Sequence, residues 1–298
     1  MAKTIEEKTV KHISTTSILA NLVLSAFKFF AGVFGHSEAL VSDSIHSLSD
    51  VFSTIIVIIG IRVASKEPDK NHQYGHERFE SVTAILLSIV LAITGFGIGL
   101  NGFNKIIEKS YLNAQIPTTI ALIAALTSII VKESMYWYTR FGAKKINSGA
   151  LMADAWHHRS DALSSVGSLI GIIGAKNGFP ILDPIATLVI CIFILKAAYD
   201  IFKDGINKMV DTSIPSKVLD SIRNEVMEVE GVIDIDLLKS RQFGNKCYVD
   251  VEISVDGNLK LFAAHEIAAK VHNNIETKFP NVKHCMVHVN PYNIDNKD

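Results

Sequence analysis

The chain has few cysteines and almost no net charge, and each of these absences excludes some classes of protein. Its three cysteines, Cys191, Cys247 and Cys285, have no paired spacing, so the sequence holds neither a CxxC motif nor a disulfide framework. The formal net charge of −1 at pH 7 argues against nucleic acid as an electrostatic partner. The N-terminus lacks a short apolar run ending in small residues, so we expect no cleavable signal there.

Motifs of several common enzyme classes are also absent. The sequence has no HExxH, no G-x-S-x-G and no Walker motif, which disfavours an intramembrane protease, a hydrolase and an ATP-driven pump. Gly95, Gly97 and Gly99 form a G-x-G-x-G run, but no predicted strand precedes it, as a dinucleotide site would require. Small residues in such an apolar stretch favour close packing of helices.

Apolar residues are abundant and unevenly placed. They make up 48% of the 298 residues, with a mean hydropathy of +0.28, and they crowd into the first two thirds of the chain. A helix needs about 20 apolar residues to cross the hydrocarbon core. We therefore predict a short N-terminal segment, 1–12, and a membrane domain, 13–204. Its six predicted transmembrane helices are 13–34, 39–64, 79–103, 116–138, 149–175 and 181–202.

Lysine and arginine are asymmetric about these helices. They gather in the N-terminal segment and in the links between the second and third and between the fourth and fifth helices. By the positive-inside rule these segments share the cytoplasmic side, which predicts that both termini are cytoplasmic.

The last third of the chain, 205–298, has the pattern of a separate soluble domain. An amphipathic helix follows Pro215 and ends at Gly231. Two alternating segments, 232–242 and 246–256, then predict paired strands. A second helix, 261–279, precedes a last strand, 284–290. The order αββαβ predicts a small two-layer α/β domain with both helices on one face of the sheet.

Two predicted membrane helices carry the same signature, Asp-x-x-His-x-x-x-Asp. Its histidine and second aspartate are four residues apart, so they lie on one helical face. Ionisable groups inside a membrane are costly and face the bundle interior. Hydrogen bonds or salt bridges between helices are the alternative, but two imidazoles and two carboxylates suit tetrahedral Zn²⁺. The expected ligands are His46, Asp50, His157 and Asp161, with Asp43 and Asp154 supporting them or lining the path.

Two further groups of polar residues lie outside the predicted spans. Asp69, His72 and His76 form D-x-x-H-x-x-x-H, whose three side chains one bend of the chain can bring together; taken alone, a solvated loop is the favoured interpretation. In the C-terminal domain, even spacing places side chains on shared sheet faces. The residues concerned are Asp236, Asp250, Glu252, His284 and His288, with His265 at the start of the second helix.

The chain resembles the cation diffusion facilitator family from about residue 14 to residue 291. The resemblance is carried by ALVSDSIHSLSD, DKNHQYGHERFES, LMADAWHHRSDALSS and the Asp183-Pro184 pair, together with six helices and a C-terminal αββαβ domain. It implies a ferredoxin-like, metallochaperone-like cytoplasmic domain and a homodimeric metal/proton antiporter, not an enzyme. It also implies that His46, Asp50, His157 and Asp161 form the transport site, with no organic cofactor.

The resemblance also indicates a metal and further sites. Histidine on both helices goes mainly with zinc in this family, with Cd²⁺, Co²⁺ and Fe²⁺ as further substrates, and it disfavours manganese. The loop residues Asp69, His72 and His76 match a peripheral metal site, and Arg78 matches a basic residue that pairs with an acid, here Asp211. Regulatory metal in the cytoplasmic domain is implied at Asp236, Asp250, Glu252, His265 and His288, although carboxylates replace some histidines of the family pattern and Asn290 replaces an acid.

Three alternatives stay open. One is an exporter of Fe²⁺ or Mn²⁺ from the same family, although its manganese members tend to have asparagine or aspartate in place of histidine. A membrane metal sensor would bind ions without moving them, although a sensor has no need of ligands in the middle of the bilayer. An intramembrane metalloenzyme would keep an open coordination position, which four protein ligands do not leave. The short link between helices four and five resembles prokaryotic members, so we expect a prokaryotic plasma membrane.

Overall fold

The computed structural model describes residues 2–34, 38–110, 119–179 and 181–292. Within the second helix, the side chains of Asp43 and His46 lie outside the described residues. The chain divides into two compact units, 1–205 and 206–298, and each is described by itself.

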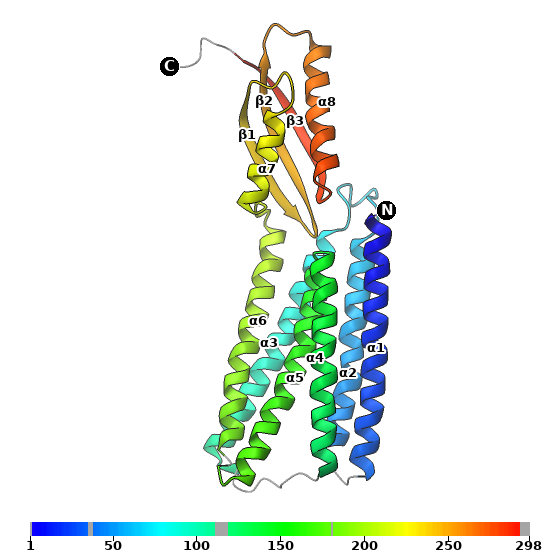
Figure 1. The fold of residues 1–298 in the computed structure, drawn as a ribbon, viewed down its shortest axis with the longest axis vertical. Coiled ribbons are helices and arrows are strands. Elements are labelled where there is room, and N and C mark those ends of the chain that lie inside the picture. The colour runs from blue at the N-terminus through cyan, green and yellow to red at the C-terminus, as the bar shows by residue number, and fades with distance from the viewer. Residues whose placement is uncertain (1, 35–37, 111–118, 180, 293–298) are drawn as a thin grey trace. The chain divides into compact units, whose positions relative to one another are not determined.

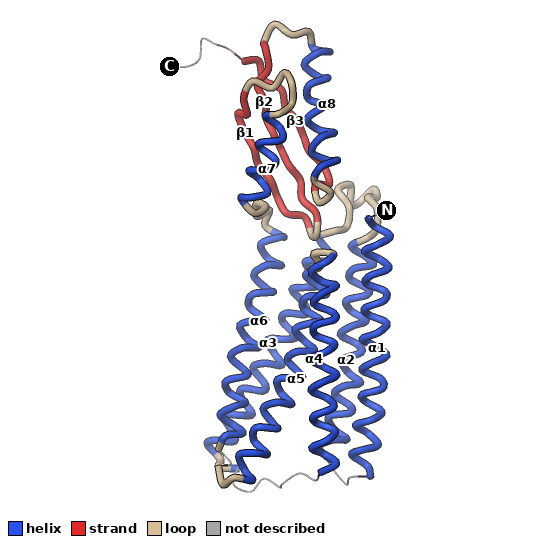
Figure 2. Tube along the Cα trace, in the orientation of Figure 1, coloured by secondary structure: helices blue, strands red, loops and turns tan. Residues whose placement is uncertain are grey.

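The first unit is a bundle of long helices (Figures 1 and 2). A 27-residue helix is about 40 Å long at 1.5 Å per residue, which exceeds the roughly 30 Å hydrocarbon core. The helices within the described residues are α1 Ala2–Phe34, α2 Glu38–Ala64, α3 Arg78–Ile107, α4 Thr119–Lys145, α5 Gly149–Lys176 and α6 Leu182–Met209.

The outer surface of this bundle is apolar. Phe34, Ile93, Phe141 and Ile192 each expose more than three fifths of their surface, and many other large apolar side chains are exposed with them. Patches this extensive are rare on soluble monomers and are expected on helices that face lipid. By length and composition alone, two described helical stretches pass a strict test for a membrane span, Lys8–Ala31 and Arg78–Ile107.

Several helices continue beyond the ends that hydropathy predicts. The first begins at Ala2 rather than at residue 13, α4 continues to Lys145 and α6 to Met209. The physical reason is that a hydropathy window locates the apolar part of a helix, whereas backbone hydrogen bonding continues through polar turns outside the hydrocarbon. Lys144 and Lys145 in the last turn of α4 are such residues.

The second unit has the order αββαβ. Its elements are α7 Ser216–Met227, β1 Asp234–Phe243, β2 Lys246–Asp256, α8 Leu261–Lys278 and β3 Val282–Tyr292. The sheet order is β1-β2-β3, with β1 and β2 antiparallel and β2 and β3 parallel (Figure 2). Phe243 pairs with Lys246 across a two-residue turn that begins at Gly244, whose φ of 62° suits a type II′ hairpin.

Alternation along β2 sets the two faces of this sheet. Val249, Val251, Ile253 and Val255 are buried and share one hydrophobic core with both helices, as their even spacing requires. Asp250 and Glu252 fall on the opposite face, which the helices leave open. The predicted two-layer α/β fold is therefore confirmed.

Candidate metal centre

The middle of the bundle contains a buried polar seam on α2. Ser44, Ser47, Asp50 and Thr54 are all nearly inaccessible to solvent, and their spacing of three or four residues gives them one helical face. Lys28 Nζ of α1 donates to Ser47 Oγ at 2.9 Å, whereas Thr54 Oγ1 donates to Asp154 Oδ1 of α5 at 3.3 Å. The seam therefore contacts α1 at its first turns and α5 at Asp50 and Thr54.

Three of the four expected transport ligands meet in this interior. One ligand atom each from Asp50, His157 and Asp161 lies within 4.8 Å of the others. His157 Nε2 lies 3.2 Å from Asp50 Oδ1, so the two helices are joined at the site itself. The fourth expected ligand, His46, lies outside the described side chains, as does Asp43.

A lysine that the sequence pattern did not assign to the site occupies its centre. Lys132 Nζ, on α4, lies 2.5 Å from Asp50 Oδ2 and 2.9 Å from Asp161 Oδ2. Its side chain is 1% exposed, so its charge is balanced by these carboxylates rather than by water. The available signal was a lysine within an apolar helix, on the same face as the buried residues Ser128 and Tyr136.

Asp154 lies beside the site rather than in it. Thr54 Oγ1 donates to Asp154 Oδ1 at 3.3 Å, and the Asp154 side chain is fully buried. His158 Nε2 is 3.7 Å from Asp154 Oδ2, beyond hydrogen-bond length, and both ring nitrogens of His158 lack a hydrogen-bond partner among the described residues. Buried polar atoms without a hydrogen-bond partner are uncommon, so His158 and Asp154 mark a second polar position next to the three ligands.

The loop before α3 forms a second group. One ligand atom each from Asp69, His72 and His76 lies within 4.8 Å of the others. The backbone N–H groups of His72 and Asn71 donate to Asp69 Oδ1 at 2.7 and 2.9 Å, which folds the loop about that carboxylate. These bonds, led by the one from His72, hold the pKa of Asp69 below its usual value, so the group remains an anionic ligand.

Two family models together match most of the chain. The cation efflux transmembrane domain matches residues 14–210, and the cation efflux protein cytoplasmic domain matches residues 214–292. The chain belongs to the cation diffusion facilitator family. It is an integral membrane protein and a transporter of divalent metal cations, with a cytoplasmic domain of the type that forms dimers.

Relatives in this family cover nearly the whole chain. The uncharacterized transporter MJ0449 of Methanocaldococcus jannaschii is 38% identical over 273 residues, which cover 92% of this chain and 95% of MJ0449. The manganese efflux system protein MneP of Bacillus subtilis is 30% identical over 293 residues, covering 96% and 97% of the two chains. The magnetosome protein MamB of Magnetospira is 31% identical over 274 residues, 92% of each chain. Membership of the cation diffusion facilitators therefore does not by itself define the metal.

The family's cytoplasmic domain carries part of its predicted regulatory set in one polar cluster. Ser254 Oγ donates to Asp236 at 2.8 and 2.9 Å, and Asn290 Nδ2 donates to Asp236 Oδ2 at 2.9 Å. Glu252 joins through Asn290 at 3.4 Å and is the register neighbour of His288. Asp250 shares the open face, whereas His265 is exposed on α8. The five-residue metal set stays a prediction.

The expected Arg78–Asp211 pair also stays a prediction, because the two residues belong to different units of the chain. Asp211 has a φ of 58°, a left-handed conformation that aspartate tolerates better than most residues, and it lies in the turn between α6 and α7.

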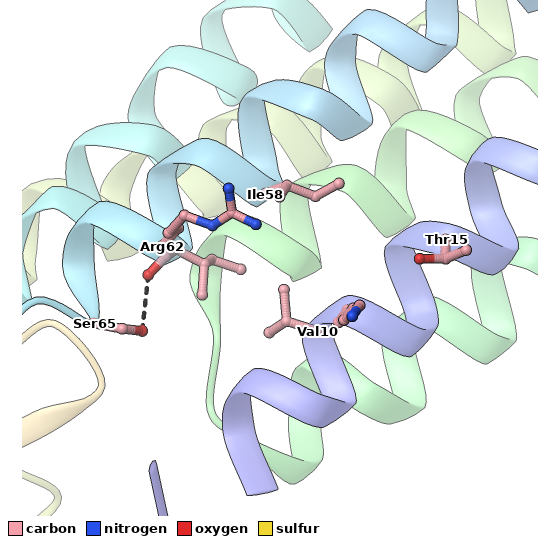
Figure 3. A pocket seen from close by; sticks show the side chains of 7 residues that line it. Val10, Thr15, Ile58, Arg62 and Ser65 are labelled. Carbon is pink, nitrogen blue, oxygen red and sulfur yellow. Dashed lines mark hydrogen bonds between the residues drawn. The ribbon is translucent and has the colours of Figure 1, made fainter. Parts of the chain in front are cut away.

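A cavity of about 400 Å³ opens between α1 and α2 (Figure 3). It is far along α2 from Asp50 and contains none of the expected metal ligands, so we do not assign it to the metal path. Its lining residues are Val10, Lys11, Thr15, Ile58, Ile61, Arg62 and Ser65.

Proposed function

We propose that the chain exports Zn²⁺, and also Cd²⁺ and Co²⁺, from the cytoplasm in exchange for protons. The observation that carries this proposal is the convergence of Asp50, His157 and Asp161 from two helices in a buried interior. His46 precedes Asp50 by four residues on α2, and its imidazole completes a tetrahedral set of two nitrogens and two oxygens.

Proton exchange follows from the ligand chemistry. Imidazole and carboxylate bind a metal only when deprotonated, so metal capture releases protons and protonation releases metal. Histidine titrates near neutral pH, which lets a proton supply on the outer side eject the ion. Alternating access then exposes the site to each side in turn. In this proposal both termini are cytoplasmic, and the protein works as a homodimer in a prokaryotic plasma membrane.

In this cycle the ammonium of Lys132 competes with the metal ion for two carboxylates. Its ammonium lies on oxygens of Asp50 and Asp161, two of the groups that the metal needs. A dication and an ammonium within a few ångströms in a low-dielectric interior repel strongly, so the ion and the lysine cannot share both carboxylates. Metal entry therefore displaces Lys132 Nζ, and its return helps to expel the ion.

The loop and the cytoplasmic domain have supporting roles in the proposal. Asp69, His72 and His76 form a peripheral site that captures cytoplasmic metal. The Asp236, Asp250, Glu252, His265 and His288 set binds regulatory metal, and Asp43 and Asp154 support the ligands of the transport site.

Manganese export is the second candidate function. MneP, named as a manganese efflux protein, is 30% identical over almost the whole chain. The three described ligands include two carboxylates, and carboxylate oxygen suits Mn²⁺, whereas imidazole suits zinc. The contribution of His46 to the coordination distinguishes the two candidates.

Transport by the purified protein in liposomes, read with one internal metal dye and one internal pH dye, tests the proposal. We expect Zn²⁺ to enter as protons leave, and Asp50→Asn to abolish both signals. Asp220→Asn, an exposed position on α7, is the matched control and keeps full flux. Faster flux of Mn²⁺ than of Zn²⁺ would establish the second candidate, and metal binding without any flux would leave a sensor.

A further inference from the structure

A third group of metal-ligating side chains lies in the second unit, apart from every residue of the predicted regulatory set. His272 and Glu276 are four residues apart on α8, and His284 comes from β3. One ligand atom from each lies within 4.8 Å of the others. The sequence offered only an H-x-x-x-E spacing on a helix, because the position of His284 depends on the β2–α8–β3 crossover.

Hydrogen bonds to the backbone of Cys285 fix the orientation of this group. His272 Nδ1 lies 2.8 Å from Cys285 O, and the Cys285 N–H donates to Glu276 Oε1 at 3.0 Å. A carbonyl oxygen only accepts, so Nδ1 of His272 carries the hydrogen and Nε2 of the neutral ring presents a lone pair. Histidine metal ligands are commonly oriented by such a bond from their other ring nitrogen to a carbonyl.

The lone pair of His272 faces an anion. Its Nε2 lies 3.4 Å from Glu276 Oε1, and His284 Nδ1 lies 3.0 Å from the same oxygen. Between a neutral His272 ring and the Glu276 carboxylate two acceptors oppose each other, and a cation placed among the three groups removes that repulsion. Oε1 also accepts the Cys285 N–H, and because each carboxylate oxygen has two lone pairs, it can keep that hydrogen bond while it binds an ion.

The composition and exposure of the group select the kind of ion. Two imidazoles and one carboxylate suit Zn²⁺ and similar transition metals, whereas Ca²⁺ and Mg²⁺ prefer oxygen ligands alone. The three side chains are 31–47% exposed, so an ion can enter from solvent and water can fill the fourth position. The nearby Cys285 supplies no thiolate, since burial and the Glu276 and Asp250 carboxylates raise its pKa to about 12.

We propose that His272, Glu276 and His284 bind a Zn²⁺ ion that clamps α8 to β3. The clamp lies at the margin of the core that Val271 and Ile275 of α8 share with Val282 and Cys285 of β3. An ion held by both elements binds the folded unit in preference to the unfolded chain, so it raises the stability of that unit by mass action. This site requires no transport, so it is independent of the proposed function.

Zinc binding to the full-length protein in detergent, measured by equilibrium dialysis with excess Mg²⁺ present, tests the clamp. We expect His272→Gln, Glu276→Gln and His284→Gln each to lose about one zinc equivalent per chain. His12→Gln, an exposed histidine of α1, is the matched control and keeps the wild-type count. The same loss is expected in an Asp50→Asn background, which separates this site from the transport site.

The unfolding temperature is a second measurement, which separates zinc bound at this site from zinc bound elsewhere on a variant. Zinc should raise the unfolding temperature of the Asp50→Asn protein, and His284→Gln in that background should reduce this rise. An unchanged zinc count together with an unchanged thermal shift in all three variants would overturn the proposal and leave the cluster as hydrogen bonds alone.

Discussion

At the residue scale, Lys132 places a buried ammonium between Asp50 and Asp161, two of the ligands in the proposed transport site. Its charge balances those of two buried carboxylates, of which Asp50 also lies 3.2 Å from His157 Nε2. Removal of one partner of a buried ion pair costs about 3–5 kcal/mol. In the proposed transport site the same removal frees two carboxylates for metal, so we expect its effects on stability and on metal affinity to have opposite signs.

We therefore predict that Lys132→Met binds Zn²⁺ at least about tenfold more tightly, a change of about 1.4 kcal/mol, and releases it more slowly. Without metal the variant unfolds at a lower temperature than the wild type, and zinc restores the difference. Competition with a chelating dye and thermal unfolding with and without zinc measure both effects. Lys196→Met, an exposed lysine on α6, is the control. Weaker zinc binding in Lys132→Met would mean that the lysine organises the ligands rather than competing for them.

At the scale of single elements, α3 approaches α6 through two of its three closely spaced glycines. A Cβ on Gly95 would lie 2.8 Å from Ile194 Cγ2, and one on Gly99 would lie 2.5 Å from Cys191 Sγ, whereas one on Gly97 meets nothing within 4 Å. The expectation that these small residues serve helix packing thus holds for the two that face α6.

Larger side chains should distinguish these positions. We predict that Gly95→Leu and Gly99→Leu lower the unfolding temperature in detergent, because overpacking costs about 1–3 kcal/mol. Gly97→Leu places the same side chain in open space and should leave the temperature nearly unchanged. Equal losses from all three substitutions would show that helix propensity or insertion, not the α3–α6 contact, determines the outcome.

The strand β3 shields its cysteine from reaction. The pKa of Cys285 is raised to about 12 from an ordinary value of 9.0, mainly by burial. Because the pKa is raised in the folded state, this thiol leaves folding stability independent of pH below about pH 9 and lowers it as the pH rises toward 12. We predict that iodoacetamide at pH 8 leaves Cys285 unmodified in the folded protein and modifies it in denaturant, as read by mass spectrometry. The cysteine of a Ser221→Cys variant, exposed on α7, should react in both conditions, and equally fast labelling of Cys285 in the folded protein would contradict the prediction.

At the scale of the whole molecule, the sequence predicts which residues share a face of one helix or strand. It misses contacts between residues that the fold brings together from different elements. The four-residue spacing in α2 and α5 predicted that Asp50, His157 and Asp161 are ligands, because helical period alone gives each pair one face. The contacts of Lys132 and His284 were missed because their partners lie on other elements; spacing within β3 paired His284 with His288 and not with α8. A lysine in an apolar helix, such as Lys132, indicates that an acidic partner exists but not which helix supplies it. For His284, the crossover between β2 and β3 determines which residue of the strand contacts α8.

The pair predicted between Arg78 and Asp211 belongs to the scale of the whole chain, because it would join the two units. Asp211→Asn removes the charge while keeping a residue that tolerates a φ of 58°, so backbone strain does not confuse the result. Arg78→Gln removes the other charge. If the residues pair, the double variant should lose no more transport than either single variant, since the second substitution removes a charge whose partner has already gone. Flux in liposomes, measured for the four proteins of this cycle, tests the pair: losses that multiply would show that each residue acts alone and would contradict the predicted pair.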